Sequence, residues 1–283
     1  MKKRLYVILI LLISVFYSQS SFSAVTNTTA DDGTTCVASG TMMTNNNSCK
    51  ATPTQYSIQI YEMGLCPSHP YGDKTEIEID LSSCTKTYSD TSPAVVDVAA
   101  AIGSTLPLTG ISTPPAEGTY RYPYMIMGQS FVASGSFANT VSSTTTTYYS
   151  AANNAVSTSA SDFATSTDNL TNFGDSDCES GYIGATVTGG TMDAFITNTA
   201  YSRSETADVT GNQCDKRGRL IAVMDLDTPV VVSSDTIAVI FNFILTDFGI
   251  EFSDSDDADV VPDSTDGFGS GPFSGYFKVL NAN

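Results

Sequence analysis

The densest group of side chains that could bind a ligand is an acidic run late in the sequence. Six aspartates fall within thirteen residues, at Asp254, Asp256, Asp257, Asp259, Asp263 and Asp266. Calcium takes six to eight oxygen ligands, often from one loop. The spacing departs from an EF-hand loop, because Ala258 stands fifth from Asp254 and no glycine stands sixth. The run is a candidate calcium site, and a solvated loop is the alternative.

Residues for catalysis are scarce. The single histidine, His69, lies in a turn between prolines, so we expect it to be exposed rather than to act as a base. No G-x-S-x-G, P-loop or H-E-x-x-H sequence occurs. A hydrolase that uses two carboxylates stays an alternative because the chain has 30 acids, although it has no tryptophan for a sugar platform. We therefore expect a protein without catalytic activity.

Six cysteines suggest a disulfide framework. They are Cys36, Cys49, Cys66, Cys84, Cys178 and Cys214. An even number in an exported chain predicts three disulfides, and fifteen pairings are open. Pairing of neighbours (36–49, 66–84 and 178–214) is favoured because each pair falls within one local stretch. A structural zinc site is disfavoured, since there is no C-x-x-C and only one histidine.

The first residues have the layout of a secretory signal peptide. Three basic residues precede an apolar run from Leu5 to Phe16, and small residues follow. Ser21 and Ser23 suit cleavage before Ala24, which makes residues 1–23 the signal. A retained anchor is disfavoured, because the run is shorter than the roughly 20 residues that span a bilayer. We expect a secreted or cell-surface protein with no membrane span after signal removal.

The net charge limits the classes of partner that we expect. The chain has 12 basic and 30 acidic residues, and the signal removes three of the basic ones. The mature chain then carries nine basic against thirty acidic side chains, a balance of −21. Such a surface repels phosphate backbones, so we expect no nucleic-acid partner.

Period-2 alternation and turn residues dominate what remains. Strands are expected at 55–63, 76–81, 119–128, 219–226 and 237–245, with a short helix or a strand at 94–103. This pattern predicts an all-β protein, a disulfide-stapled β-sandwich over residues 54–283. A polar arm at 24–53 precedes it, and a polar Ser/Thr-rich insertion at about 138–217 interrupts it.

Two strands carry more specific expectations. Pro123 cannot donate to a ladder, so the strand around it should lie at an edge or carry a bulge. Residues 237–245 are apolar on both faces, which predicts a central strand. An exposed tyrosine cluster at Tyr120, Tyr122 and Tyr124 is a candidate binding surface, and packing on the sheet is the alternative.

The stretch "PPAEGTYRYPY" resembles a strand entry of bacterial cell-surface β-sandwich modules of the prealbumin-like and fimbrillin-like kind. The shared residues are Pro115, Gly118 and Tyr120, and "DTPVVVSSDTIAVIFNF" at 227–243 is similar to a later core strand of those families. The resemblance covers residues 54–137 and 219–280. It implies a structural or adhesive role on the cell surface.

Together these features predict a secreted structural or adhesive surface protein, such as the subunit of a filament or surface layer. Self-assembly would use open sheet edges, with the polar arm free to pair with a neighbour. The first alternative is a calcium-dependent module that binds an extracellular ligand such as a carbohydrate. The second is an exported hydrolase that uses two carboxylates. The surface ligand is not identified by the sequence.

Overall fold

The structure is a computed structural model of the 283-residue chain. It describes residues 10–12, 28–29, 35–36, 48–72, 78–141, 144–171, 173, 182–187, 189–203, 217–253, 267–271 and 274–282. These residues form an all-β fold in which every strand pair is antiparallel. The helical segments are 3₁₀ turns at Ala99–Ala101, Ala152–Asn154 and Ala160–Asp162.

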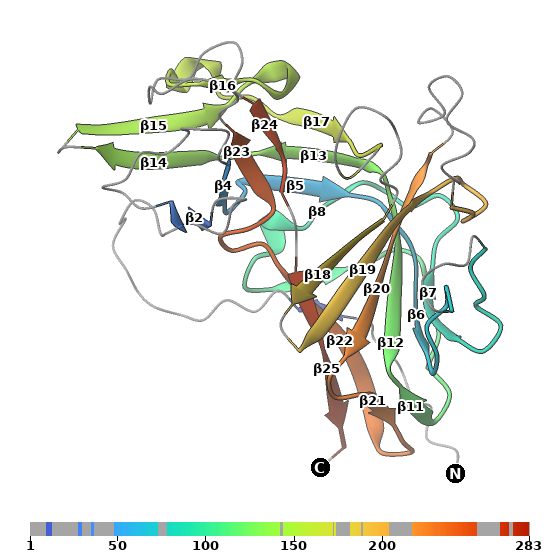
Figure 1. The fold of residues 1–283 in the computed structure, drawn as a ribbon. Coiled ribbons are helices and arrows are strands. Elements are labelled where there is room, and N and C mark those ends of the chain that lie inside the picture. The colour runs from blue at the N-terminus through green and yellow to red at the C-terminus, as the bar shows by residue number, and fades with distance from the viewer. Residues whose placement is uncertain are drawn as a thin grey trace.

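A seven-stranded sheet is the largest element of the sandwich and stands on the right in Figure 1. Its strands, in spatial order, are β10 (Ile111–Ser112), β7 (Thr85–Ser89), β6 (Ile60–Cys66), β12 (Tyr122–Gly128), β20 (Arg219–Leu226), β19 (Gly190–Thr197) and β18 (Tyr182–Val187). The edges of this sheet differ in length, because β10 has two residues and β18 has six.

Smaller sheets make up much of the rest of the fold. They are β17 (Ser166–Asn169), β13 (Ser130–Ser134), β5 (Gln55–Ile58) and β8 (Val96–Asp97); β14 (Ser136–Val141), β15 (Thr144–Ser150) and β16 (Val156–Ser157); and β24 (Gly267–Ser270), β23 (Ile250–Ser253) and β4 (Ser48–Ala51). Two-stranded pairs complete the fold: β22 (Thr236–Ile244) with β25 (Ser274–Asn281), β11 (Gly118–Tyr120) with β21 (Val230–Val232), β1 (Ile10–Leu12) with β9 (Thr105–Pro107), and β2 (Thr28–Thr29) with β3 (Thr35–Cys36).

Apolar side chains fill both faces of the seven-stranded sheet. The main core joins its inner face to the smaller sheets, and Tyr56 there packs on Phe131 and Phe243 with ring centroids 5.7 and 6.4 Å apart. A second cluster lies on the outer face, where Tyr124 and Phe195 are buried. The sheet is therefore covered on both sides, which explains the near-continuous burial of β12.

The predicted strand at 55–63 is two strands in different sheets. The chain leaves β5 at Gln59 and enters β6, so it passes from the four-stranded sheet to the seven-stranded one. The Gln59 side chain donates to the carbonyl of Pro93 at 3.0 Å, and its carbonyl accepts from Gly128 N–H at 2.9 Å. Both the backbone and the side chain of Gln59 are therefore hydrogen-bonded at the point where the chain passes from one sheet to the other.

The predicted strand at 76–81 is wrong for residues 78–81, which form no strand. They belong to a loop closed by the Cys66–Cys84 disulfide, whose Cα atoms lie 4.2 Å apart. Ile79 and Leu81 pack against the outer cluster as expected of inward positions, but they do so from the loop. The disulfide joins the last residue of β6 to the residue that precedes β7.

Two other expectations need correction. The strand with Pro123 is central rather than at an edge, because β12 pairs with β6 and β20, whereas the alternative of a bulge agrees with the register shift in its ladder to β6 between Ile126 and Met127. Pro123 is tolerated because the ladder to β20 begins one residue later, at Tyr124, so no N–H is needed on that side. β22 is largely buried on both faces but pairs with β25 on one side only within the described chain. Residues 96–101 combine the short strand β8 with a 3₁₀ turn.

Segments predicted to lie outside the sandwich contribute strands to it. The polar region 138–217 supplies β18 and β19 to the seven-stranded sheet and β17 to the four-stranded one. The arm at 24–53 supplies β4, which pairs with β23. Residues 10–12, within the predicted signal, form β1 beside β9.

Candidate functional site: an open sheet edge and its buried anchor

The edge strand β18 is paired on one side only. It pairs with β19 along its whole length, from Tyr182 opposite Phe195 to Val187 opposite Gly190. In the described part of the chain no strand lies on its other side. Its sequence, YIGATV, contains no charge and no proline, and its first five residues are exposed. Natural edge strands are commonly guarded by charges, prolines or bulges, so an unguarded edge of this length is a candidate interaction site.

Apolar side chains reach solvent along this edge. Tyr182 is 39% exposed and Ile183 is 45% exposed. The turn to β19 contains Gly189 at φ 83°, a left-handed conformation that suits glycine and a tight hairpin. Gly190 follows, and a Cβ there would lie 2.1 Å from the carbonyl oxygen of Asp225. The close approach of β19 to β20 therefore requires glycine at 190.

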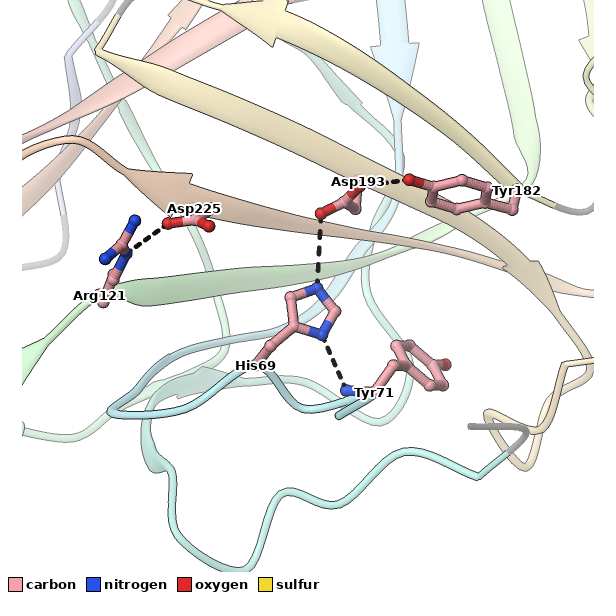
Figure 2. Close-up of polar contacts among 6 residues, drawn as sticks. All are labelled: His69, Tyr71, Arg121, Tyr182, Asp193 and Asp225. Atoms are coloured by element: carbon pink, nitrogen blue, oxygen red, sulfur yellow. Dashed lines mark hydrogen bonds and ion pairs between the residues drawn. The ribbon is translucent and has the colours of Figure 1, made fainter. Parts of the chain in front are cut away.

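A buried carboxylate anchors the edge strand. Asp193 on β19 is 1% exposed, and its Oδ1 accepts a hydrogen bond from the Tyr182 hydroxyl at 2.7 Å (Figure 2). Gly184 lies opposite Asp193, and a Cβ at Gly184 would lie 3.0 Å from the Tyr182 hydroxyl oxygen. Glycine at 184 thus leaves room for the tyrosine to cross its own strand and reach the carboxylate.

The other oxygen of the same carboxylate faces the single histidine. Asp193 Oδ2 lies 3.5 Å from His69 Nε2, and the His69 side chain is 6% exposed. His69 Nδ1 accepts from Tyr71 N–H at 3.1 Å, so in the neutral ring the proton is on Nε2 and points toward the carboxylate. The expectation that His69 is exposed is wrong, because the Cys66–Cys84 loop folds it back onto the sheet.

The role of this histidine follows from its geometry. A general base needs a ring nitrogen with a lone pair aimed at a substrate proton. Both nitrogens of His69 are directed at protein groups, Nδ1 at Tyr71 and Nε2 at Asp193. His69 therefore ties the disulfide loop to β19, and Asp193 connects that loop to the edge strand (Figure 2).

Aromatic rings pack around the anchor. The Phe195 ring lies 5.2 Å from Tyr182 and 4.4 Å from Tyr71, and Tyr122 meets His69 edge-on at 5.5 Å. The Arg203 guanidinium sits 4.8 Å from the Phe195 centroid, and burial lowers its pKa. These contacts fix the outer side of β18, while no strand of the described residues pairs with its hydrogen-bonding edge.

Two charged pairs lie elsewhere on the same face. Arg121 Nε contacts Asp225 Oδ1 at 2.5 Å, and the bond to Asp225 raises the pKa of Arg121 (Figure 2). Glu62, which is 7% exposed, accepts from the Tyr124 hydroxyl at 2.7 Å and pairs with Lys86 at 2.6 Å. Each of these two carboxylates has a positively charged partner beside it, so its charge is compensated locally.

The predicted tyrosine surface is not an exposed platform. Tyr120 is buried in the main core and donates to the carbonyl of Ala116 at 2.9 Å, whereas Tyr124 is buried in the outer cluster. Tyr122 is half-buried beside His69. The alternation is real, but the chain passes from β11 to β12 at Arg121, so the three rings do not share one surface.

The predicted disulfides and metal ligands are only partly described. Cys66 and Cys84 are joined as expected, and Cys49 is disulfide-bonded. Cys178 and Cys214 lie outside the described residues, as do all six aspartates from 254 to 266, and nothing is described of the Cys36 side chain. Among the residues described, no group of three or more His, Cys, Asp or Glu side chains could hold a metal ion.

One apolar hollow opens between the inner face and the β22–β25 pair. It is lined by Pro123, Tyr124, Met125, Met192, Ala222, Met224, Phe241 and Phe277. No carboxylate lines it, so it lacks the paired acids of a glycosidase-type site. Over the described ranges, no helix is long and apolar enough to cross a bilayer.

Comparison with known proteins gives no relatives. No protein-family model, no curated protein and no solved structure matches this chain. The sequence and the geometry above are therefore the basis for proposing a function.

Proposed function

We propose that this protein is a secreted structural subunit of the cell surface that associates through the open edge of its seven-stranded sheet. The observation that carries the proposal is β18, a six-residue edge strand without charge or proline and with exposed apolar side chains. An exposed row of backbone N–H and C=O groups is a template for pairing with another strand.

Several features support export and a structural role. The start of the sequence has signal-peptide layout, and disulfides such as Cys66–Cys84 persist in oxidising compartments. The polar groups near β18 act as supports, since His69 and Asp193 bind protein atoms on the sheet. The edge is held rigidly, which reduces the entropy that pairing must overcome.

The test is the assembly state of the chain purified after export. Light scattering across a concentration series and electron microscopy, at low and raised calcium, should show association. Ile183→Lys puts a charge on the edge and should weaken association on the order of tenfold or more. Mass spectrometry of the purified chain would locate the signal cleavage.

The matched control is Ile237→Lys. Ile237 is also an isoleucine on a strand and is also 45% exposed, but it lies on β22. Association should survive this change. Monomers at every concentration, or equal behaviour of the two lysine variants, would refute the proposal.

A further inference from the structure

We infer, building on the proposed function, that the partner of β18 is β18 of a second copy, paired antiparallel about a two-fold axis with Ala185 at its centre. The lengths of the sheet edges carry the first step. A head-to-tail contact between the two edges of the seven-stranded sheet would join β18 to β10, which offers two residues of ladder. Self-pairing with Ala185 at the centre lets five residues of β18, 183–187, take part. The two copies would then share one continuous sheet.

The faces of β18 restrict the register. Opposite residues of an antiparallel pair point to the same face of the sheet. Tyr182 lies on the outer face with Asp193, and Val187 packs against the main core on the inner face. Because side chains alternate, Ile183 and Ala185 share the inner face with Val187. The axis must therefore pass through a residue, not between two residues.

Side-chain matching selects Ala185 as that residue. With Ala185 opposite itself, the exposed Ile183 of one copy lies opposite Val187 of the other, and β-branched pairs stabilise sheets. With Gly184 opposite itself, Ile183 would face Ala185 and the centre would have no side chain to pack. The first arrangement buries more apolar surface.

Charge permits this contact despite a net charge of −18. Across β18 and its neighbour β19 the one charged residue is Asp193, and it is 1% exposed and engaged with Tyr182 and His69. The approaching edges therefore carry no exposed charge, and repulsion comes from more distant acids. Salt screens distant charges, so association should strengthen as ionic strength rises.

A two-fold contact of this kind closes on itself. An isologous interface uses the same patch on both copies and is complete in a dimer. The edge β18 would accordingly build a dimer, and a filament would need a second contact elsewhere on the molecule.

Cysteine cross-linking tests the register. In the described chain no cysteine is free, and the probe is an introduced thiol. Opposite Cα atoms in antiparallel pairs lie about 4.5–5.5 Å apart, within the range that a disulfide bridges. After mild oxidation, Ala185→Cys should form a covalent dimer with itself. Ile183→Cys should do so only when mixed with Val187→Cys, and Ile237→Cys should stay monomeric on a non-reducing gel.

The outcomes separate this pairing from the proposed function. Association that is sensitive to Ile183→Lys but leaves Ala185→Cys without a cross-link, in a variant that unfolds at the wild-type temperature, would overturn the two-fold pairing alone. Cross-linking of Ile183→Cys with Ala185→Cys would move the centre to Gly184 and overturn the register. A chain that stays monomeric at all salt concentrations would overturn both proposals.

Discussion

Replacing the buried carboxylate that anchors the edge strand should destabilise the protein strongly. Asp193→Asn keeps the shape of the side chain but exchanges one oxygen for an NH₂ group. If the amide oxygen continues to accept from Tyr182, the NH₂ group faces the Nε2–H of His69, and two donors oppose each other. If the histidine changes tautomer to accept, its Nδ1–H opposes Tyr71 N–H. Each arrangement replaces a favourable polar contact by two donors that face each other.

The magnitude follows from burial. A buried polar group left without its partner costs about 1–3 kcal/mol. Exchanging a charged acceptor for a neutral one weakens the 2.7 Å bond from Tyr182 by about 1 kcal/mol more. Removing the desolvation cost of a buried charge offsets part of this loss. We expect Asp193→Asn to lower the free energy of unfolding by about 2–3 kcal/mol.

The assay is urea unfolding followed by circular dichroism, with a control in the same sheet. Asp225→Asn makes the same exchange at a carboxylate that is 25% exposed and pairs with Arg121 on the surface. Surface pairs contribute about 0–1 kcal/mol, so the control should change little. A double-mutant cycle of Asp193→Asn with Tyr182→Phe should show coupling of at least about 0.5 kcal/mol. Equal losses for both asparagine variants, together with additivity in the cycle, would refute the account of the anchor.

Three further predictions concern the scaffold. Gly190→Ala puts a Cβ 2.1 Å from the carbonyl oxygen of Asp225, so it should lower the free energy of unfolding in urea by about 1–3 kcal/mol. An unchanged urea midpoint would contradict the close approach of β19 to β20. Burial raises the pKa of Tyr56 above its ordinary value, so above pH 10 the unfolded state binds fewer protons and stability falls as pH rises. Tyr56→Phe should reduce that slope by up to about 1.4 kcal/mol per pH unit between pH 9 and 11, and an identical slope would count against it. Replacing Cys66 and Cys84 together by alanine opens a loop of 18 residues and should cost about 3 kcal/mol, with a wild-type melting temperature as the contrary result.

The strands of this fold were predictable where burial of one or both faces leaves a pattern of apolar residues in the sequence. The stretches at 119–128, 219–226 and 237–245 became β11 with β12, β20 and β22 because their alternating or continuous apolar residues could only be buried in sheets. Their neighbours were not predictable, because pairing joins residues far apart in the chain. Pro123 predicted an edge or a bulge because it lacks an N–H. The strand is nevertheless paired on both sides, which is possible because its ladder to β20 starts after Pro123.

The candidate site was harder to predict than the strands. Nothing in YIGATV distinguishes an edge strand from an internal one, since its position depends on which strands occupy the sites beside it. His69 has turn residues on both sides, and only the disulfide that folds its loop onto β19 brings it to Asp193. One signal was available: Gly184 and Gly190 mark places where a side chain or the backbone approaches closely.

The placement of charge along the sequence connects the acidic composition to the open edge. Asp175, Asp177 and Glu179 precede β18, and the strand itself has none. Charges that flank an apolar strand protect it from aggregation during export without blocking its edge after folding. The turn at Gly189 follows the C-terminal end of β18. With Ala185 at the centre, the pairing is confined to the uncharged residues 183–187, and a paired segment of fixed length favours a defined two-fold contact over an indefinite stack.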